Sequence, residues 1–458
     1  MRKHIATGTL GSAWGNLITG IIYIYFGNAI GLTRLEWGIL TGIGSWSVIA
    51  QPLGALIGER AGSRRMVWFW TALADRVLRM IGVIASWLLW RAGRGEAALL
   101  FIFVMCLGPL VGNLSPGLWY GWFATIIPKE VQGAFWGRRD SWISLVVALV
   151  TLPSGLVMDV VPRELKMETA TAILTAGSVM GFIDLLVHRT IPEPPYEAAP
   201  VRGSLAGILG PLKDRRFRPW LVFTGAWNLS QSLGGSLATL YLMENIGFKN
   251  DLLGGMFSIT IVGLLGTFLA ARRMGRMVDR YGIKRVLAVS HLLWTVVPAV
   301  WLLALPGPWA IVWVSLAGVL GTVFSTAATN ASVKLATRFP ARDDGGMYMA
   351  ISTVVGSLAN GLGALLAGVY LTAAGAWSMS VGGLVVSAFP MLFIVSFVTR
   401  LASVSLLLPR VRTTSSPAES ETPFLLPLFF EGVPGIARLT RAGRPAPPPR
   451  PSRSRHAR

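Results

Sequence analysis

Long apolar segments recur along this 458-residue chain and stop only towards its C-terminal end. Apolar residues make up 53% of the sequence, and only 14% of the residues are charged. A helix of about 20 apolar residues crosses the ~30 Å hydrocarbon core of a bilayer, and it satisfies its own backbone hydrogen bonds where water is absent. We therefore predict an all-α polytopic membrane protein, with twelve transmembrane helices near residues 5–29, 37–58, 66–90, 97–127, 138–159, 169–189, 219–245, 253–274, 286–304, 309–335, 347–372 and 378–400.

The net charge of +20 could indicate nucleic-acid binding, but the distribution of the charges argues against it. With twelve helices and the N-terminus inside, most of the 41 Lys and Arg residues fall in cytoplasmic segments, which is the positive-inside pattern of membrane proteins. We expect a multi-pass protein of the inner membrane with both termini in the cytoplasm, surrounded by lipid and without a nucleic-acid partner. Met1–His4 leads into an apolar stretch that has no clear cleavage site, so we interpret it as the start of an uncleaved first helix.

The two halves of the chain look like copies of one another. Ile30–Leu32 precedes Gly38 by the same spacing at which Ile246–Phe248 precedes Gly254. From about residue 406 the chain is polar, basic and rich in Pro, and such a segment cannot bury enough apolar area to become ordered. We predict an N-terminal six-helix bundle at 1–189, a cytoplasmic linker loop at 190–218, a C-terminal six-helix bundle at 219–405 and a disordered cytoplasmic tail at 406–458.

Two basic loops, one in each half, carry the most specific motif. Each has an acid followed by Arg, a Gly three positions beyond the acid, and further basic residues: Glu59, Arg60, Gly62 and Arg64 in the first loop, and Asp279, Arg280, Gly282 and Lys284 in the second. The pattern resembles the loop between the second and third helices of each half of the major facilitator superfamily, Gly-x-Leu-Ala-Asp-Arg-x-Gly-Arg-Lys. The first copy departs from it at Ala55, Glu59 and Ser63, and the second at Met277, Val278 and Ile283.

This resemblance implies two pseudo-symmetric six-helix bundles with a substrate site at their interface near the midplane. It implies that Glu59 and Asp279 act as latches, each beside a helix N-terminus of the opposite half, where a carboxylate gains ~0.3–1 kcal/mol. The basic residues of the loops would add ion pairs, and the two glycines would permit tight turns. The alternative is that the basic residues only set the topology.

Polar side chains at helical spacing are candidates for the substrate site. In the facilitator fold the first, fourth, seventh and tenth helices line the central cavity, and all four of the corresponding segments carry such residues. The alternative is that these hydroxyls and amides only join neighbouring membrane helices, at about 0.6 kcal/mol each. The candidates are Ser12, Asn16, Thr19, Tyr23, Asn113, Trp119, Tyr120, Thr224, Trp227, Asn228, Gln231, Thr322, Thr326 and Asn330.

Glycines predict where the halves approach one another closely. Gly38 and Gly42 are four apart in the second helix, and Gly361 and Gly368 lie in the eleventh. In the facilitator fold these helices form part of the contact between the halves, and close backbone contact requires small residues.

Asp75, Arg79 and Glu244 lie within predicted helices, where a charge at the bilayer centre costs ~2.5–3.5 kcal/mol. Asp75 and Arg79 are four apart in the third helix and can pair along it. The third helix is usually peripheral to the cavity in the facilitator fold. We therefore favour a buried ion pair that braces this half over a proton-sensitive relay. Glu244, near the outer end of the seventh helix, is the one carboxylate in a predicted cavity helix and the other candidate for ion coupling.

The sequence has no arrangement typical of catalysis, nucleotide binding or metal binding. It lacks a Gly-rich phosphate loop, its four His residues are scattered, and Cys106 is its single cysteine. We expect neither an enzyme nor a cofactor or metal. We expect a monomer that moves a small organic solute, such as a sugar or another neutral polar compound, by secondary active or facilitative transport with rocker-switch alternating access. The alternatives are an exporter of amphipathic drugs or metabolites by proton antiport, and a non-transporting membrane sensor.

Overall fold

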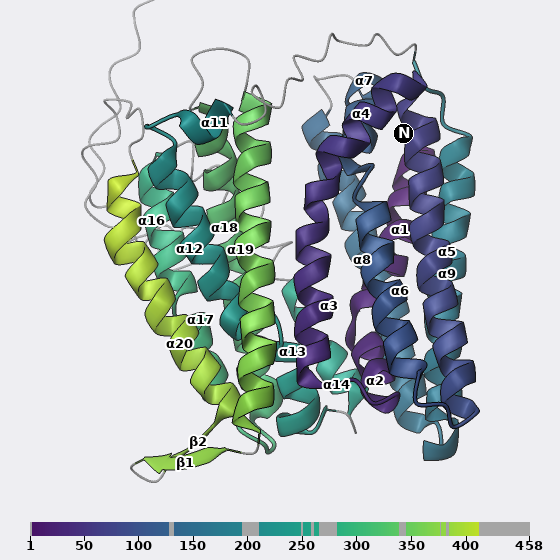
Figure 1. The fold of residues 1–458 in the computed structure, drawn as a ribbon, viewed down its shortest axis with the longest axis vertical. Helices are drawn as coiled ribbons and strands as arrows, with labels where there is room; N and C mark the ends of the chain where they lie inside the picture. Colours follow the sequence, from purple (N-terminus) through teal and green to yellow (C-terminus); the bar gives the residue numbers. More distant parts are fainter. Residues whose placement is uncertain are drawn as a thin grey trace, which may run out of the picture.

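The computed structural model describes residues 2–127, 132–194, 210–248, 251–257, 261–264, 282–338, 345–375, 377–381 and 384–411. Its helices run along the long axis of the molecule in two groups that lie side by side (Figure 1). Seven described segments are long and apolar enough to cross a membrane: Ala97–Trp119, Arg138–Val160, Arg163–Arg189, Ile283–Leu302, Ala310–Val333, Tyr348–Ala374 and Ala388–Arg410. The predicted polytopic α-helical class is therefore confirmed.

The first group contains the described residues up to 194. Helix α1 packs against α8 and α9, and α5 packs against α6 and α9. The predicted fourth helix is interrupted before Pro116, which begins α7, because Pro lacks an N–H donor but fits the first turn of a helix. The elements are α1 (Arg2–Thr19), α2 (Ile21–Ala29), α3 (Arg34–Trp46), a 3₁₀ turn (Ser47–Ala50), α4 (Gln51–Ala61), α5 (Arg64–Arg91), α6 (Ala97–Gly112), α7 (Pro116–Ile126), α8 (Gln132–Val160), a 3₁₀ turn (Arg163–Leu165) and α9 (Lys166–Arg189).

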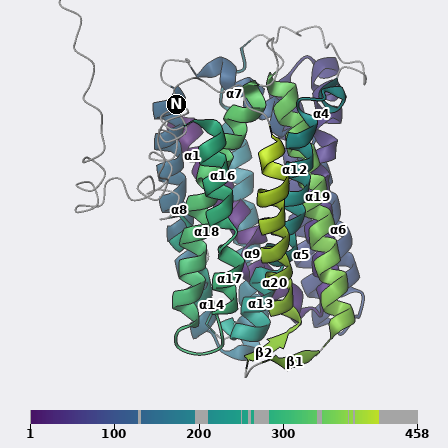
Figure 2. The ribbon, with the colours of Figure 1, turned by 90° about the vertical axis from the view of Figure 1, so that its left-hand side faces the viewer.

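The second group contains the described residues from 210 onwards. Helix α12 packs against both α19 and α20, and α16 packs against α18. Figure 2 views the molecule from the side of this group. The helices are α11 (Gly210–Lys213), α12 (Arg218–Gly235), α13 (Ala238–Tyr241), a π-helical turn (Leu242–Ile246), α14 (Leu252–Met256), α16 (Ile283–Trp294), α17 (Val297–Leu302), α18 (Ala310–Arg338), α19 (Gly345–Ala374) and α20 (Ala388–Ala402), followed by a π-helical turn (Ser403–Leu407) and a 3₁₀ turn (Leu408–Arg410).

The prediction of a helix at 378–400 was wrong in its first part. Strands β1 (Ser378–Val381) and β2 (Leu384–Ser387) form an antiparallel hairpin there, with Ser378 opposite Ser387, and α20 begins at Ala388. Valine and glycine are poor helix formers, so the apolar character of this segment reflects a hairpin rather than a helix. Helical turns continue to Arg410, and Leu408 and Val411 are buried against the second group. Ordered packing thus extends past the tail boundary expected at 406.

The two groups meet along α3 and α19. A Cβ atom placed on Gly38 would lie 3.0 Å from the Cα of Gly368, and one on Gly42 would lie 3.1 Å from the carbonyl oxygen of Gly361. Such distances leave room only for glycine. The close contact that these glycines predict between the second and eleventh helices is present.

The molecule has two ends with different packing. The hairpin end carries β1, β2, α13 and α14, and the N-terminal end carries the start of α1 (Figures 1 and 2). At the hairpin end one hydrophobic core joins the groups, since Phe26 and Trp37 belong to the same cluster as Tyr241 and Phe389. Towards the N-terminal end, the described residues form two further cores, one within each group.

Candidate functional site

The second group contains a cavity of about 400 Å³, which we call the aromatic cavity. Helix α12 contributes one of its faces, because residues three and four apart fall on the same side of a helix. Helices α16, α18 and α19 supply the other walls, together with Ser45 of α3 and Val48 of the 3₁₀ turn that follows it. The principal lining residues are Ser45, Val48, Trp220, Phe223, Thr224, Trp227, Asn228, Gln231, His291, Trp294, Thr329, Ser352, Gly356 and Asn360.

Aromatic rings form a continuous wall of this cavity. The rings of Phe223 and Trp227 are stacked with centroids 6.2 Å apart, and Trp294 lies 5.3 Å from Trp227. His291 meets Trp227 edge-on at 4.5 Å. Its Nδ1 lies 2.7 Å from the carbonyl oxygen of Leu287, and because a carbonyl only accepts, Nδ1 carries the proton. The neutral imidazole therefore has Nε2 available as an acceptor.

Some polar groups of the aromatic cavity are hydrogen-bonded within the protein, and others have unused hydrogen-bonding capacity. Ser45 Oγ donates to Asn360 Oδ1 at 3.0 Å, and Asn228 Nδ2 donates to the carbonyl oxygen of Thr224 at 2.8 Å. Thr224 Oγ1 and Trp227 Nε1 are buried without a hydrogen-bond partner among the described residues. A buried polar atom without a partner costs about 1–3 kcal/mol. A ligand with matching donors and acceptors would remove this cost.

A second cavity, of about 420 Å³, lies between the two groups, and we call it the central cavity. It adjoins the aromatic cavity along α3 and the 3₁₀ turn that follows: Thr41 and Gly44 line the central cavity, and Ser45 and Val48 line the aromatic one. These four residues follow the three-and-four spacing of a single helix face. The remaining lining residues are Thr19, Tyr23, Ile24, Trp37, Leu40, Arg79, Met105, Pro109, Asn113, Ser236, Leu237, Thr239 and Leu240.

The structure pairs Asp75 with Arg79, whose Nε donates to Asp75 Oδ1 at 2.7 Å. Gly108 of α6 makes room for the pair, because a Cβ atom there would lie 2.9 Å from Asp75 Oδ1. The two residues have different surroundings: Arg79 lines the central cavity, whereas Asp75 lies behind it in none of the three cavities. The third helix, expected to be peripheral, therefore reaches the space between the groups through Arg79.

A third cavity, of about 270 Å³, lies within the first group, and we call it the charged cavity. Arg76 Nη2 donates to Asp184 Oδ2 at 2.7 Å, and both residues are buried. The Nδ1 of His188 is 2.8 Å from Asp184 Oδ1, and its Nε2 accepts from Trp119 Nε1 at 3.2 Å. The Trp14 ring lies 4.4 Å from the guanidinium carbon of Arg76. The polar and charged side chains described here thus pair with one another in a chain that runs from Arg76 through Asp184 and His188 to Trp119.

The sequence-derived candidates divide among the three cavities. Thr224, Trp227, Asn228 and Gln231 line the aromatic cavity; Thr19, Tyr23 and Asn113 line the central one; Ser12 and Trp119 line the charged one. The remaining candidates, Asn16, Thr322, Thr326 and Asn330, line none of the three, and the side chain of Tyr120 lies outside the described part.

Three of these four side chains hydrogen-bond their own helix. Asn16 donates to the carbonyl oxygen of Ser12, Thr322 to that of Gly318 and Thr326 to that of Thr322. Such local bonds satisfy a hydroxyl or amide without any ligand. A polar residue on a lining helix is therefore not by itself a lining residue.

Sequence reasoning missed the pair of Arg76 with Asp184 and most of the aromatic wall. Trp220 and Phe223 precede Trp227 at helical spacing, and this period could have identified them. No sequence signal connects Arg76 with Asp184, which approach each other only through the packing of α5 on α9.

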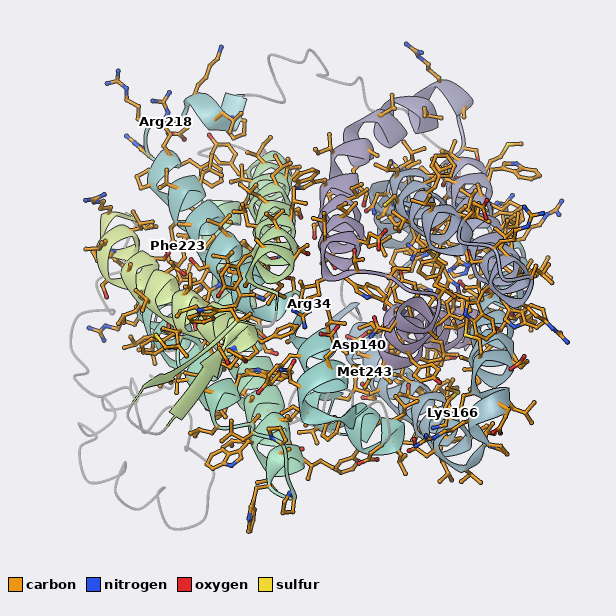
Figure 3. The ribbon with its side chains drawn as sticks, turned by 60° about the horizontal axis from the view of Figure 1, so that its bottom comes forward. Arg34, Asp140, Lys166, Arg218, Phe223 and Met243 are labelled. Carbon is orange, nitrogen blue, oxygen red and sulfur yellow. The ribbon has the colours of Figure 1, made fainter. Side chains whose placement is uncertain are left out.

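Glu244 joins the two groups at the hairpin end instead of lining one of the cavities. Its Oε2 lies 3.0 Å from Arg34 Nη2. Arg34 also donates to the carbonyl oxygens of Leu371 at 3.4 Å and Gly375 at 3.1 Å, where α19 ends. Figure 3, turned to bring the hairpin end forward, places Arg34 between the two groups. A cation at a helix C-terminus is favoured by the helix dipole.

A second contact joins the groups at the same end, and here the charged residue is an anion instead of a cation. Asp159, at the end of α8 in the first group, accepts from the backbone N–H of Leu252 at 2.9 Å and of Leu253 at 2.8 Å. These two residues begin α14 in the second group. The groups are therefore joined at one point by an anion at a helix start and at another by a cation at a helix end.

The two basic loops are described only in part. Gly62 has φ +63° and Gly282 has φ +85°, left-handed values that favour glycine. In the first loop, Glu193 accepts from the backbone N–H of Arg64 at 2.7 Å and of Arg65 at 3.0 Å. The start of the linker thus caps α5.

The latches expected across the groups stay predictions. The side chain of Glu59 and the residues Asp279 and Arg280 lie outside the described part of the chain. Arg60 is exposed, and Lys284 Nζ donates to the carbonyl oxygen of Pro409 within its own group, at 3.4 Å.

No model of a known protein family and no curated protein matches this sequence. Solved structures do match the fold. A mutant of the nucleoside transporter NupG matches with a TM-score of 0.67 and 13% identity, covering 90% of this chain and 99% of the other. The inward open xylose transporter XylE from E. coli matches with a TM-score of 0.61 and 16% identity, over 90% and 98%. The E. coli fucose:proton symporter FucP matches with a TM-score of 0.56 and 12% identity, over 90% and 99%.

These matches extend over nearly the whole length of both chains, at identities that speak to fold alone. They agree with the arrangement described above, in which two groups of membrane-length helices meet along α3 and α19. The chain therefore has the fold of the major facilitator superfamily of transporters.

Proposed function

We propose that this protein is a secondary active or facilitative transporter that moves a small organic solute across the inner membrane by rocker-switch alternating access. The observation that carries the proposal is the aromatic cavity, in which Thr224 Oγ1 and Trp227 Nε1 are buried without a partner among the described residues. This cavity adjoins a second one at the contact between the groups. In this fold, transporters bind substrate between their halves near the midplane.

The packing of the two ends supports alternating access. The contacts of Arg34 and Asp159 join the groups at the hairpin end, whereas the cores nearer the N-terminal end are separate. Such asymmetry is typical of one of the two states of a rocking transporter. With both termini in the cytoplasm, as the positive-inside pattern favours, the hairpin end is the outer end and this conformation faces inward.

The lining of the aromatic cavity suits the uncharged part of a solute that carries a ring. Ring stacking against Phe223, Trp227 or Trp294 contributes about 0.5–1.5 kcal/mol beyond burial. The Gln231 amide makes no side-chain hydrogen bond within the described structure, so it can bind hydroxyl or amide groups of the solute. Sugars and nucleosides both have this combination of a ring with hydrogen-bonding groups.

A thermal-shift panel on the detergent-purified protein tests the proposal. Sugars, nucleosides, amino acids, carboxylates and amphipathic compounds are compared, since a ligand at one hundred times its Kd stabilises the folded state by about 2.7 kcal/mol. Asn228→Ala should abolish most of the shift. Thr322→Ala is the matched control, because its hydroxyl bonds its own helix and lines none of the three cavities. Equal shifts in both variants would place binding elsewhere.

The aromatic wall also favours a second candidate, an exporter of amphipathic compounds. Four large rings, Trp220, Phe223, Trp227 and Trp294, would hold an apolar solute by burial alone. Cells expressing the protein would then accumulate less of such a compound, and an uncoupler of the proton gradient would restore its level. A transporter that imports polar solutes would show neither effect.

A further inference from the structure

We propose that the transported solute carries an anionic group, a carboxylate or a phosphate, and that Arg79 binds this group in the central cavity. The inference rests on the proposed function, since the aromatic cavity would hold the rest of the solute. It replaces the neutral solute expected from the sequence by an acid that has an uncharged ring.

The guanidinium of Arg79 offers a binding edge to the central cavity. Its Nε is used by Asp75, but its two terminal nitrogens have no hydrogen-bond partner in the described part of the chain. Arg79 lines the cavity and Asp75 does not, so an entering anion meets the positive end of the pair first. A guanidinium binds carboxylate or phosphate through two parallel N–H···O bonds.

Hydroxyl groups lie in the same cavity as this edge. Tyr23 and Thr41 line it together with Arg79, and neither hydroxyl is hydrogen-bonded within the described structure. Each can donate to an oxygen of the anion that the guanidinium leaves unused. The amide of Asn113, by contrast, already donates to Ser47 Oγ at 2.7 Å and to the carbonyl oxygen of Pro109 at 3.1 Å.

The charge of the two adjoining cavities selects for an anion over a cation. Among the described lining residues of the aromatic and central cavities, none is Asp or Glu. Arg79 is the one lysine or arginine among those described lining residues. A cationic solute would lose its hydration without gaining a partner, which is costly in a site of low polarity.

A second, independent observation is the buried cation beside the aromatic cavity. Arg400 of α20 is 3% exposed and donates to the carbonyl oxygens of Trp294 at 3.2 Å and Gln231 at 3.3 Å. Its guanidinium carbon lies 5.7 Å from the Trp227 ring. No Asp or Glu in the described structure pairs with it, although buried charges are normally paired. This charge adds to the positive potential beside the two cavities, which favours an anion over a cation.

The geometry fits a solute of modest length. The shared face runs from Thr41 of α3 in the central cavity to Val48 of the following 3₁₀ turn in the aromatic cavity, a distance of about 10 Å along the helix axis. An aromatic ring with a short acidic arm spans such a distance. The ring would then stack on the aromatic wall while the acid reaches Arg79.

Pairs of compounds that differ only in charge test the inference. Indole-3-acetate is compared with indole-3-acetamide, and 3-phenylpropanoate with 3-phenylpropanamide, by thermal shift and calorimetry at pH 7.5; phenyl phosphate distinguishes a preference for phosphate from one for carboxylate. We expect each acid to bind wild type at least about tenfold more tightly than its amide. Arg79→Gln should abolish this preference and leave amide binding unchanged. Arg91→Gln is the matched control, because Arg91 is exposed at the far end of the same helix.

Arg79→Lys covers the possibility that the Gln variant fails to fold, since Lys keeps the charge beside Asp75. Lys lacks the planar fork, so we expect a partial loss of the preference. Equal binding of acid and amide by wild type overturns the inference, as does a preference that survives in a folded Arg79→Gln protein. If neutral sugars or nucleosides bind and no acid does, the inference fails while the proposed function stands. If no solute of any class binds, the proposed function itself fails.

Discussion

The two groups of helices have similar architecture but handle charge in different ways. Within the first group, Arg76 pairs with Asp184 and Arg79 with Asp75, and all four side chains are at most 14% exposed. The second group contains Arg400, which is buried against backbone carbonyls with no acidic partner among the described residues. The aromatic cavity beside Arg400 is lined mainly by rings, hydroxyls and amides.

This difference leads us to expect that the two groups recognise different parts of the solute. Buried ion pairs contribute little net stability when complete, but they fix geometry, and removing one partner leaves an uncompensated charge. The first group therefore holds its charges in place, and it presents one guanidinium edge to the central cavity. The second group provides a surface on which an uncharged ring can stack and form hydrogen bonds.

The largest effect expected from this comparison comes from breaking the buried pair of the first group. Asp184→Ala leaves Arg76 buried without its carboxylate, and breaking such a pair costs about 3–5 kcal/mol. We expect a large fall in the midpoint of thermal unfolding in detergent. The double variant Arg76→Met with Asp184→Leu removes both charges and should recover most of the loss. If the double variant is no more stable than Asp184→Ala, the pair acts through something other than charge balance.

Arg400→Met provides the counterpart in the second group. The variant loses two hydrogen bonds to carbonyl oxygens but leaves no carboxylate unpaired. It also relieves the cost of burying a charge, so we expect a net loss of only about 1–2 kcal/mol. Thermal unfolding compared with that of Asp184→Ala measures the difference directly. A larger loss for Arg400→Met than for Asp184→Ala would reverse the contrast between the two groups.

Sequence patterns predicted the fold because helix length and internal repeats are local properties. Apolar segments of membrane length located most of the helices, and glycines such as Gly38 located the contact between the groups. The hairpin at 378–387 was not predicted, because its residues are apolar but do not form a helix. Hydropathy alone does not distinguish a strand from the first turns of a membrane helix.

The candidate site was predicted only in part, for a related reason. One face of α12 carries Thr224, Asn228 and Gln231 at helical spacing, and all three line the aromatic cavity. The pairing of Arg76 with Asp184 joins helices far apart in sequence, and it depends on packing that no local pattern encodes. Arg79 was assigned a bracing role because the third helix was expected to be peripheral, whereas it lines the central cavity.

Trp119→Phe tests how much the hydrogen bond from Trp119 to His188 stabilises the charged cavity of the first group. Phe keeps the ring but removes the indole N–H that donates to His188 Nε2. The loss of one hydrogen bond costs about 0.5–1.5 kcal/mol, so we expect a small decrease in thermal stability. Trp227→Phe is the matched change in the second group, where the indole N–H has no partner in the described structure. We expect Trp227→Phe to lower the thermal stability less than Trp119→Phe does. Equal losses would contradict the difference between the two groups.

The smallest effect concerns a contact that joins the two groups at the hairpin end. Asp159→Asn keeps the shape of the side chain but removes the charge that caps the start of α14. A charge at a helix N-terminus contributes about 0.3–1 kcal/mol. Its loss should shift the equilibrium between conformations about two- to fivefold towards opening at the hairpin end. A single cysteine introduced as Thr41→Cys in a Cys106→Ser background reports this shift, because Thr41 lines the central cavity.

Labelling of that cysteine by a membrane-impermeant maleimide, added to the outer face of right-side-out vesicles, should become faster with Asp159→Asn. Asp140→Asn is the control: Asp140 lies on the same helix with a side chain 69% exposed, and it makes no contact with the second group among those described. Arg34→Gln removes the cation from the end of α19 and breaks several contacts at once, so it should accelerate labelling more than Asp159→Asn. If Asp159→Asn and Asp140→Asn label alike, the backbone contacts of Asp159 do not depend on its charge. Opening at the hairpin end would then depend on the glycine contact between α3 and α19, to which the two groups contribute equally.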